Sequence, residues 1–357
     1  MVFVFLNINI GEKVKMVKSK SLRRFLVILS ILGISISAVG CSNTSKESTS
    51  ETSSQSVESS NFEPVEFIYS DGAKDYDVKV ETPRQKAVTL SQFMTEMLLA
   101  LDLGDKMVGT ALLDNPILPE FEEDYKKIPE LEIGEGHSIS KEAFIATGAD
   151  FVSGWDMSIS EQTTGSPDEL IEKDITPFLA KSYSPDATVE TVYEDFELLG
   201  KIFGVQDKAK EVIENMKSDI KSVTDKVGDI KENDRLKVMV YDSGEDKAMA
   251  VGSGLANNLI ELSGGKNIFS NEDKPYINAT WESVVAENPE VIVVTDYLAG
   301  NPVQDKIDFL KNHPALKDVD AIKNDRIYVV GLADLSPGIR NSKVIEKMYG
   351  YFYGENK

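Results

Sequence analysis

The sequence predicts an α/β protein of two lobes, each with a mostly parallel sheet, joined by a single long α-helix. The main observation is the stretch 188–227, where apolar residues recur at steps of three and four, as on one face of a helix. Strand patterns alternate with helix patterns on both sides of this stretch, which is typical of parallel sheets covered by helices. A length of 357 residues allows two domains of usual size.

The chain begins with the features of a targeting segment. Six basic residues precede an apolar run at 25–34, and small residues follow up to Gly40. This is the pattern of a secretory signal peptide, predicted at residues 1–40, and the run is too short for a typical spanning helix. Met16 begins a conventional signal peptide, so we expect translation to start there and not at Met1.

The only cysteine of the chain, Cys41, directly follows the predicted cleavage site. This context resembles a bacterial lipobox, in which the cysteine becomes the lipidated N-terminus. The alternative is a plain secretory signal with an incidental cysteine. Residues 41–63 are rich in Ser, Thr and Glu and cannot bury enough surface to fold, so we predict a disordered tether. The protein is then expected on the extracytoplasmic face of the cell membrane, held by a lipid.

The charge of the chain is strongly negative. It has 38 Lys and Arg against 60 Asp and Glu, a formal net charge of −22. Such a surface argues against nucleic-acid binding. We expect a monomer.

The first α/β lobe is predicted at residues 64–187. Asp71-Gly72 between two alternating segments indicates a β-hairpin, and short apolar runs bounded by turn residues indicate buried strands. The predicted elements are hairpin strands at 65–69 and 76–80, strands at 87–90, 108–110, 151–153 and 175–178, and helices at 93–101, 141–147 and from 167.

A helical pair is predicted at residues 188–230. The periodic pattern breaks once, so we expect one helix at 189–203 and a second at 208–227, about 30 Å long at roughly 1.5 Å per residue. Gly204 suits a helix C-terminus, and Asp207 is positioned to cap the second helix. A stiff helix between two lobes should limit their relative motion. The alternative is an ordinary core helix of one domain.

The second α/β lobe is predicted at residues 231–357. The Gly264-Gly265 pair within it is not a phosphate loop, because no Gly-Lys-Ser/Thr sequence follows. The predicted elements are strands at 236–241, 248–251, 291–295 and 327–330, and helices at 255–262, 281–287 and 341–352.

Catalytic patterns are not found in the sequence. The two histidines, His137 and His313, are far apart, and no His-Glu-x-x-His, Gly-x-Ser-x-Gly or nucleophilic cysteine motif occurs. We therefore predict that the protein is not an enzyme. A dedicated zinc or manganese receptor is also unexpected, because such sites draw on more histidines.

Ligand binding is the better interpretation, and the residues that follow strands are its candidates. Ligands of open α/β sheets bind outside the carboxyl ends of the strands, and two lobes place a cleft there. Trp155 can stack on a flat ligand, and Arg340 can bind a carboxylate or catecholate oxygen. Their alternatives are a core side chain and a surface salt bridge, respectively. The candidate ligand-binding residues are Trp155, Asp156, Tyr183, Tyr241, Tyr297 and Arg340.

Several segments, in order, resemble a known family. They are TLSQFMTEMLLALDLGDKMVGT, ISKEAFIATGADFVSGW, LIELSGGKNIF, TWESVVAENPEVIVVTDY, HPALKDVDAIKNDRIYVV and LSPGIRN. With the hairpin and the long helix, they resemble the bacterial ABC-transporter substrate-binding proteins for iron-siderophores and cobalamin, from Val65 to the C-terminus. The resemblance implies two Rossmann-like lobes and, as partners, an ABC permease with its ATPase subunits. It also implies that Glu142 and Glu282 contact arginines of the permease.

The resemblance implies a ferric siderophore as the ligand. With no cysteine or histidine cluster the chain offers few soft ligands, so a metal already held in an organic chelate fits better than a bare ion. We expect no resident cofactor and no protein ligand to the iron. An anionic chelate would be bound by Arg340, so that Arg340→Ala weakens binding without changing stability. The alternatives are cobalamin or another corrinoid, haem with an axial residue such as His137, and a surface lipoprotein without transport function.

Overall fold

The computed structural model describes residues 62–134 and 138–354. The predicted signal peptide, Cys41 and nearly all of the predicted tether lie outside the described residues, as does His137. The proposed start at Met16 also falls there.

An antiparallel hairpin opens the described chain. Strands β1 (Val65–Ser70) and β2 (Asp75–Val80) pair in register from Val65↔Val80 to Ser70↔Asp75. The Asp71 carboxylate accepts hydrogen bonds from the amides of Ala73 and Lys74, at 2.9 and 2.8 Å, and so closes the turn. Gly72 has a φ of 82°, a conformation that favours glycine. The predicted hairpin is confirmed.

The first sheet is entirely parallel and has the strand order β4-β3-β5-β6. Three of the helices beside it begin at a serine whose side chain accepts a backbone hydrogen bond: Ser91 before α1, Ser140 before α3 and Ser166 before α4. The elements are β3 (Ala87–Leu90), α1 (Gln92–Ala100), β4 (Met107–Thr110), α2 (Glu122–Tyr125), α3 (Lys141–Ala146), β5 (Phe151–Gly154), α4 (Pro167–Glu172) and β6 (Thr176–Phe178).

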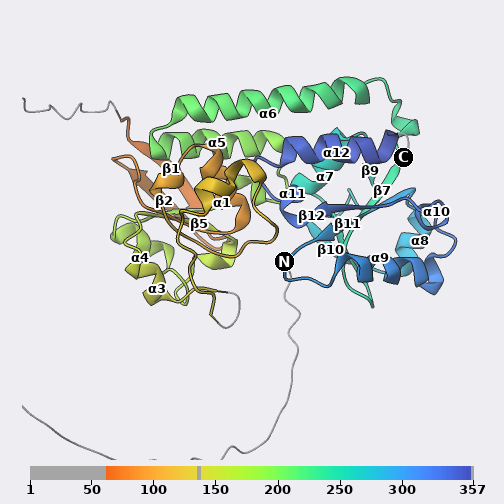
Figure 1. The fold of residues 1–357 in the computed structure, drawn as a ribbon, viewed down its shortest axis with the longest axis horizontal. Helices are drawn as coiled ribbons and strands as arrows, with labels where there is room; N and C mark the ends of the chain where they lie inside the picture. Colours follow the sequence, from red (N-terminus) through yellow and green to blue (C-terminus); the bar gives the residue numbers. More distant parts are fainter. Residues whose placement is uncertain (1–61, 135–137, 355–357) are drawn as a thin grey trace, which may run out of the picture. The chain divides into compact units, whose positions relative to one another are not determined.

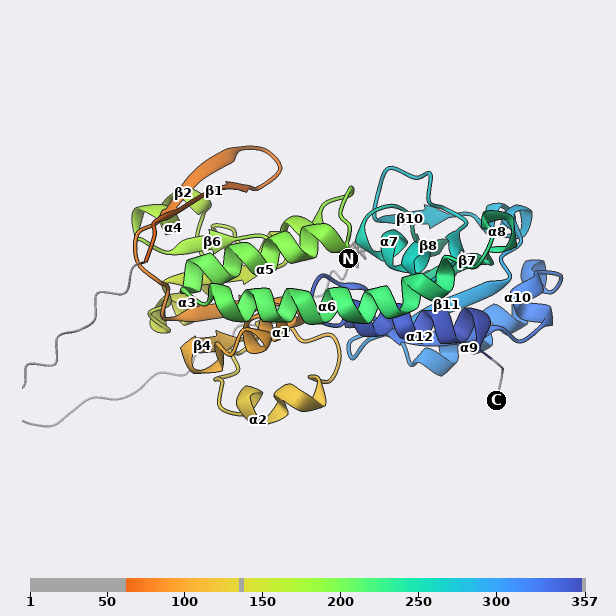
Figure 2. The ribbon, with the colours of Figure 1, turned by 90° about the horizontal axis from the view of Figure 1, so that it is seen from above.

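Two helices connect this sheet to the next. Helix α5 (Val189–Phe203) has the predicted bounds and ends at Gly204, which is left-handed with a φ of 73°. Helix α6 (Gln206–Val227) begins two residues earlier than predicted, and its N-cap is Val205 without a side-chain bond. The expectation that Asp207 caps α6 is therefore wrong, because the tight glycine turn already places Asp207 in the first helical turn. Figures 1 and 2 show α6 lying along α5 at one end and along the C-terminal helix α12 (Asn341–Tyr353) at the other.

The second sheet is mixed. Its order is β10-β8-β7-β11-β12, with β9 also paired to β7. Strands β7, β9, β11 and β12 are mutually parallel, whereas β8 and β10 run antiparallel to their neighbours β7 and β8. The elements are β7 (Lys237–Ser243), β8 (Ala248–Val251), α7 (Leu255–Leu262), β9 (Lys266–Asn267), β10 (Tyr276–Ala279), α8 (Trp281–Glu287), β11 (Val291–Asp296), α9 (Val303–Asn312), α10 (Asp320–Lys323), β12 (Ile327–Gly331) and α11 (Leu332–Leu335).

The two sheets repeat one local arrangement. In the first, the Asp150 carboxylate accepts a hydrogen bond of 2.8 Å from the amide of Lys86, just before β3. In the second, the Glu290 carboxylate accepts one of 2.9 Å from the amide of Lys237, at the start of β7. Each acid lies between a short helix, α3 or α8, and the strand that follows it.

We call the two sheets with their covering helices the first and second lobes. The exact boundaries of the predicted domains stay a prediction.

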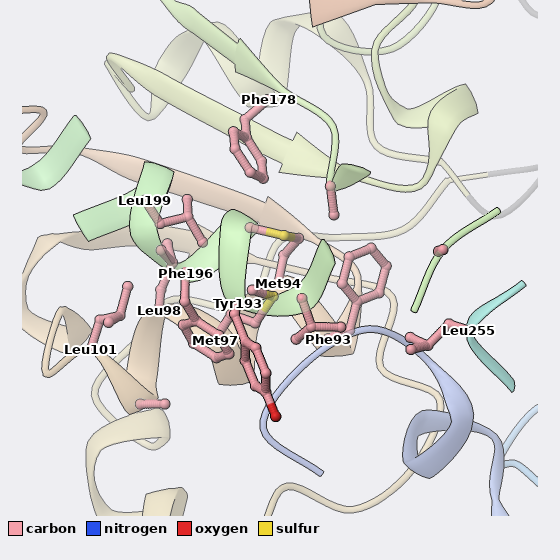
Figure 3. Close-up of a cluster of buried hydrophobic side chains, with 14 of the residues drawn as sticks. Phe93, Met94, Met97, Leu98, Leu101, Phe178, Tyr193, Phe196, Leu199 and Leu255 are labelled. Atoms are coloured by element: carbon pink, nitrogen blue, oxygen red, sulfur yellow. The ribbon is translucent and has the colours of Figure 1, made fainter. Parts of the chain in front are cut away.

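The hydrophobic core has two parts. The larger contains the buried side chains of the first lobe and of α5, α6, α7 and α12, and Figure 3 shows its region around Phe93 and Phe196. Leu255, from the second lobe, lies at the edge of that view. The smaller part fills the other face of the second sheet, around Tyr241 and Trp281. The observed α/β architecture confirms the predicted fold class.

Among the described residues, none of the helices combines the length and apolar character needed to span a membrane.

Candidate ligand-binding site

The carboxyl ends of strands from both sheets meet at one place. The side chain of Asn115, in the loop after β4, donates to the carbonyl of Asp296 at 2.9 Å and accepts from the amide of Ala333 at 2.9 Å. The amide of Leu298 donates to the carbonyl of Asp114 at 2.7 Å. The loop after β4 thus touches the ends of β11 and β12. We call the region where the strand ends of the two lobes face each other the inter-lobe junction.

An ion pair crosses this junction. Arg340, just before α12, donates from Nε and Nη2 to the two carboxylate oxygens of Glu96 on α1, at 2.6 and 2.7 Å. Its Nη1 donates to Asp334 at 3.1 Å, and Nη2 also donates to the carbonyl of Pro116 at 2.6 Å. The side chains of Arg340 and Glu96 are only 11% and 2% exposed. We call this group of contacts the Arg340 latch.

The latch gives Arg340 protein partners, and its predicted contact with a ligand stays a prediction. Four of its five N–H groups are used by protein acceptors, so a ligand would have to displace at least one of them. Burial opposes its charge, but the carboxylates of Glu96 and Asp334 outweigh burial and raise the pKa of Arg340. The ion pair with Glu96 is buried and links the two lobes, so it is not the surface salt bridge given as the alternative.

Aromatic side chains gather on the first-lobe side of the junction. Trp155 follows β5 directly and is half-buried, with its ring edge-on to Phe93 at 5.0 Å and to Tyr183 at 5.5 Å between centroids. A Cβ at Gly154 would lie 2.7 Å from Leu90, so the preceding position requires glycine. Burial, and next the charge of Asp156, raise the pKa of Tyr183 to about 12, so its hydroxyl stays protonated. Asp156 itself is exposed.

The turn that carries Tyr183 is fixed by a buried acid. Asp195 on α5 accepts hydrogen bonds from the amides of Lys181 and Ser182, at 2.8 and 2.9 Å, and from the hydroxyl of Ser182. Burial, stronger than these hydrogen bonds, raises the pKa of Asp195 to about 6. Sequence reasoning missed Asp195, although its spacing from Val192 and Leu199 places it on the buried face of α5, where an acid needs hydrogen-bond partners.

The second lobe contributes Tyr276, a residue that sequence reasoning also missed. It begins β10, a strand that was not predicted because the segment before it is polar and irregular. Burial raises the pKa of Tyr276, and the charges of Asp242 and Asp114 and the neighbouring Tyr183 raise it further. Asp114 and Tyr183 belong to the first lobe, so charges of both lobes act on the phenol of Tyr276.

Tyr241 and Tyr297 line a cavity of about 240 Å³ in the second lobe. The β7–β8 turn, the loop after β11 and the start of α9 form its other walls. Tyr241 is otherwise a core side chain that packs on Trp281 and donates to the carbonyl of Gly244 at 3.1 Å. The ring of Tyr297 lies 4.2 Å from the ammonium of Lys306. Both tyrosines therefore face the cavity, and Tyr297 is the more accessible of the two.

Lys306 is a buried cation beside this cavity. Its ammonium donates to the carbonyl of Thr295 at 2.8 Å, and burial lowers its pKa although Asp242 and Asp296 oppose that shift. Asp242 accepts from the hydroxyls of Thr295 and Ser243, at 2.7 and 2.9 Å. Sequence reasoning missed Lys306 because helix α9 was not predicted, although Val303, Ile307 and Leu310 follow helical spacing.

Asp114, in the loop after β4, is an acid of the junction whose carboxylate is not fully hydrogen-bonded. Its Oδ2 is buried and has no hydrogen-bond partner, and burial raises the pKa of its carboxyl group to about 6. At neutral pH the group is nevertheless mostly ionised, so a negative charge faces Tyr276 and Tyr297.

The two glutamates implied to contact a permease lie in equivalent places. Glu142 on α3 and Glu282 on α8 are both exposed, and each is the same number of residues before the strand that follows. Within the described residues neither carboxylate has an ion-pair or hydrogen-bond partner. An exposed aliphatic side chain, Ile145 or Val285, follows one turn later, 56% and 39% exposed respectively.

The described histidine is not at the junction. His313 accepts from the amide of Ala315 at 3.3 Å and packs on Trp281 and Phe309. Trp281 is a core residue whose indole donates to the carbonyl of Glu245 at 2.7 Å. Within residues 62–134 and 138–354, no three His, Cys, Asp or Glu side chains are grouped to hold a metal ion.

Comparisons with known proteins identify the family. A family model described as periplasmic binding protein matches residues 88–331. A periplasmic binding protein from Veillonella parvula has a solved structure that is 30% identical, with a TM-score of 0.76, and covers 83% of this chain and 100% of its own.

Curated relatives agree with this match. An ABC transporter substrate-binding lipoprotein of Bacillus subtilis, YvrC, is 25% identical over 268 residues, which cover 73% of this chain and 77% of the relative. A vitamin B12-binding protein of Vibrio campbellii is 22% identical over 219 residues, covering 61% and 74%. Since the family model matches more than half of the chain, and the resemblance found in the sequence points the same way, the protein belongs to the periplasmic binding protein family.

Proposed function

We propose that this protein is the substrate-binding lipoprotein of an ABC importer, and that it captures a ferric siderophore at the inter-lobe junction. The observation that carries this proposal is the grouping of aromatic rings and oxygen atoms from both lobes. Trp155 and Tyr183 come from the first lobe and Tyr276 from the second, with Asp114 and Asp242 around them. Family membership supports the same conclusion.

The chemistry of these side chains suits a metal that is already chelated. Rings offer stacking and apolar contact to the organic part of a chelate, whereas hydroxyls and carboxylates bind its polar edge. Pockets for ligands of drug size have volumes of about 300–1,000 Å³. The cavity beside Tyr297 has about 240 Å³. A siderophore therefore needs space between the lobes in addition to this cavity.

A corrinoid is the second candidate, because curated relatives are named vitamin B12-binding proteins. A corrin ring with its amide groups could use the same rings and oxygen atoms. Haem is a third candidate, with the phenol of Tyr183 or Tyr276 as its axial ligand, because His313 packs in the second-lobe core.

The test is mass spectrometry of the ligand that co-purifies from the native host, followed by calorimetric titration of the emptied protein. We expect an iron chelate, and loss of most of the affinity in Trp155→Ala. The matched control is Tyr349→Ala, which removes a half-buried aromatic side chain of α12 that packs on Tyr353 and lines no part of the cavity. Recovery of a corrinoid would replace the siderophore proposal, and binding of neither class would remove it.

We further propose that a lipid on Cys41 anchors the protein on the extracytoplasmic face of the membrane. The name of the Bacillus relative, a lipoprotein, supports this proposal. Cys41→Ala should release the protein from the membrane fraction into the medium or periplasm. Retention of the variant in the membrane would contradict the anchor.

A further inference from the structure

Three cations near the strand ends of the junction, Arg340, Lys306 and Lys181, are already engaged, whereas Lys247 and Lys274 are exposed on second-lobe loops beside the acids Asp246 and Asp273. Arg340 is held by Glu96, Asp334 and Pro116. Lys306 is buried against the carbonyl of Thr295 and the ring of Tyr297. Lys181, in the turn before Tyr183, forms an exposed ion pair with Glu194. Each of these three cations would have to leave a protein partner before it could bind an anion.

The carboxylates of the same region, in contrast, are not paired with a cation among the residues that the structure describes. Asp114, Asp156, Asp242 and Asp296 form no ion pair within 4.0 Å in the described part of the chain. Asp242 accepts only from hydroxyl groups, and one oxygen of Asp114 accepts from nothing. Asp156 is exposed and accepts from its neighbouring amide of Met157 at 2.8 Å. Lys306 offsets part of the charge of Asp242 and Asp296, and within the described residues Asp114 and Asp156 form no ion pair with a cation.

The carboxylates face the same rings that the proposed function assigns to the ligand. Asp156 directly follows Trp155, whose ring packs on Tyr183 at 5.5 Å between centroids. Asp242 accepts from the hydroxyl of Thr295 at 2.7 Å, and the carbonyl of the next residue, Asp296, accepts from Asn115, which follows Asp114. In addition to burial, the charge of Asp156 raises the pKa of Tyr183, and the charges of Asp242 and Asp114 raise that of Tyr276. Asp114 and Asp156 belong to the first lobe and Asp242 to the second. A ligand placed among these rings therefore meets negative charge from both lobes.

We propose that the junction selects a cationic metal chelate, such as a ferric trihydroxamate with a free amine, and rejects anionic chelates. This inference rests on the proposed function and specifies its substrate class. It replaces the expectation that Arg340 binds an anionic chelate. The physical reason is Coulombic: close carboxylates attract a cation and repel an anion, and the effect is stronger where water is partly excluded.

The first experiment compares three ferric chelates by calorimetric titration. They are ferrioxamine B, a trihydroxamate with a free ammonium group, ferrichrome, a neutral trihydroxamate, and a ferric tris-catecholate, which is anionic. We expect the affinity to fall in that order, and the preference for the first over the second to shrink in high salt because salt screens exposed charges. Tightest binding of the tris-catecholate would overturn the charge selection while leaving the siderophore function in place.

The second experiment removes single charges. Asp156→Asn and Asp114→Asn keep the shape of the side chain, and each should weaken ferrioxamine B about five- to tenfold while leaving ferrichrome nearly unchanged. The control is Asp229→Asn, which removes one exposed charge after the end of α6. Equal losses for both chelates would mean a structural role and would overturn the inference. Failure of all three chelates to bind the wild-type protein would remove the proposed function together with it.

Discussion

At the residue scale, a few buried acids fix the surroundings of the proposed ligand. Asp195 is the clearest case, because it binds the backbone of the turn that presents Tyr183. A buried carboxylate whose pKa is raised favours folding at low pH, since the folded state then binds the proton more tightly than the unfolded chain.

Asp195→Asn tests this role. Oδ1 of asparagine still accepts, but its amide group would face a donor, so we expect a loss of about 1–3 kcal/mol of unfolding free energy at pH 7. Because the pKa of Asp195 rises from 3.8 to about 6 on folding, the wild type gains stability as the pH falls from about 6 to about 4, and the variant lacks this gain. Urea unfolding at both pH values checks the difference. A constant difference between the two proteins would contradict the raised pKa.

The sequence could not predict which residues of the site contact each other. Arg340 was singled out by its place in the loop after β12, but its partner Glu96 is 244 residues earlier in the chain. No periodic pattern connects residues so far apart, and Glu96 looks like an ordinary helical acid. Asp114 and Tyr276 were missed for a similar reason, because each lies in an irregular, polar segment whose burial depends on the other lobe.

At the element scale, the prediction succeeded wherever burial imposes a period. Helix α5 and helix α7 have the predicted bounds, and the strands with continuous apolar runs were all found. Strand β10 was missed because it is an edge strand with little burial. Helix α9 was missed because most of its surface is polar. Both missed elements belong to the site, since β10 carries Tyr276 and α9 carries Lys306.

The contact between α5 and α6 depends on a glycine inside α5. A Cβ at Gly200 would lie 2.6 Å from the Cβ of Ala209 on α6, which is shorter than real contacts between such atoms. Gly200→Ala should therefore destabilise the protein by about 1–3 kcal/mol through overpacking. Gly350→Ala on α12 is the matched control, because nothing lies within 4 Å of a Cβ there.

We expect the control to be neutral or stabilising by up to about 1 kcal/mol, since alanine favours a helix interior more than glycine does. Urea unfolding of both variants measures the two effects. If Gly200→Ala is as stable as the wild type, α5 and α6 can separate without cost and do not form a tight pair.

The helices α3 and α8 permit a test of docking to a permease. Because Glu142 and Glu282 are exposed and unpaired at matching positions, charge reversal of both to lysine should leave ligand affinity intact and abolish uptake in cells. Acids near a helix N-terminus also stabilise the helix by about 0.3–1 kcal/mol, so melting temperatures must be compared. The control reverses Glu172 and Glu346, exposed acids on α4 and α12. Normal uptake by the first double variant would exclude this docking role.

At the scale of the whole molecule, the long helix and the Arg340 latch act with the hydrogen bonds of Asn115 and Leu298 to hold the lobes together. Helix α6 packs along α5 and α12, and the Arg340 latch joins α1 to the segment before α12. A helix resists bending along its length, whereas an ion pair can open. The latch is therefore the part that a ligand-driven change would act on.

The last prediction concerns this latch. Arg340→Ala leaves the carboxylate of Glu96 buried without its cation, which should cost about 3–5 kcal/mol of unfolding free energy. That result differs from the sequence-based expectation of unchanged stability. The control is Lys343→Ala, which breaks an exposed ion pair of 2.8 Å with Asp219 and should cost less than about 1 kcal/mol. In the double variant Glu96→Gln/Arg340→Ala the loss should be smaller than in Arg340→Ala, because an amide replaces the buried charge.

Small-angle scattering then separates the latch from the helix. In the wild type, both restraints act, so the radius of gyration should change only slightly when ferrioxamine B is added. In Glu96→Gln/Arg340→Ala the packing of α6 and the hydrogen bonds of Asn115 and Leu298 remain, and we expect a larger radius in the free protein that ligand binding reduces. A large compaction of the wild type would show that neither the latch nor α6 limits the lobes. An unchanged radius in the double variant would show that the lobes stay in place without the latch, as expected from a stiff helix between them.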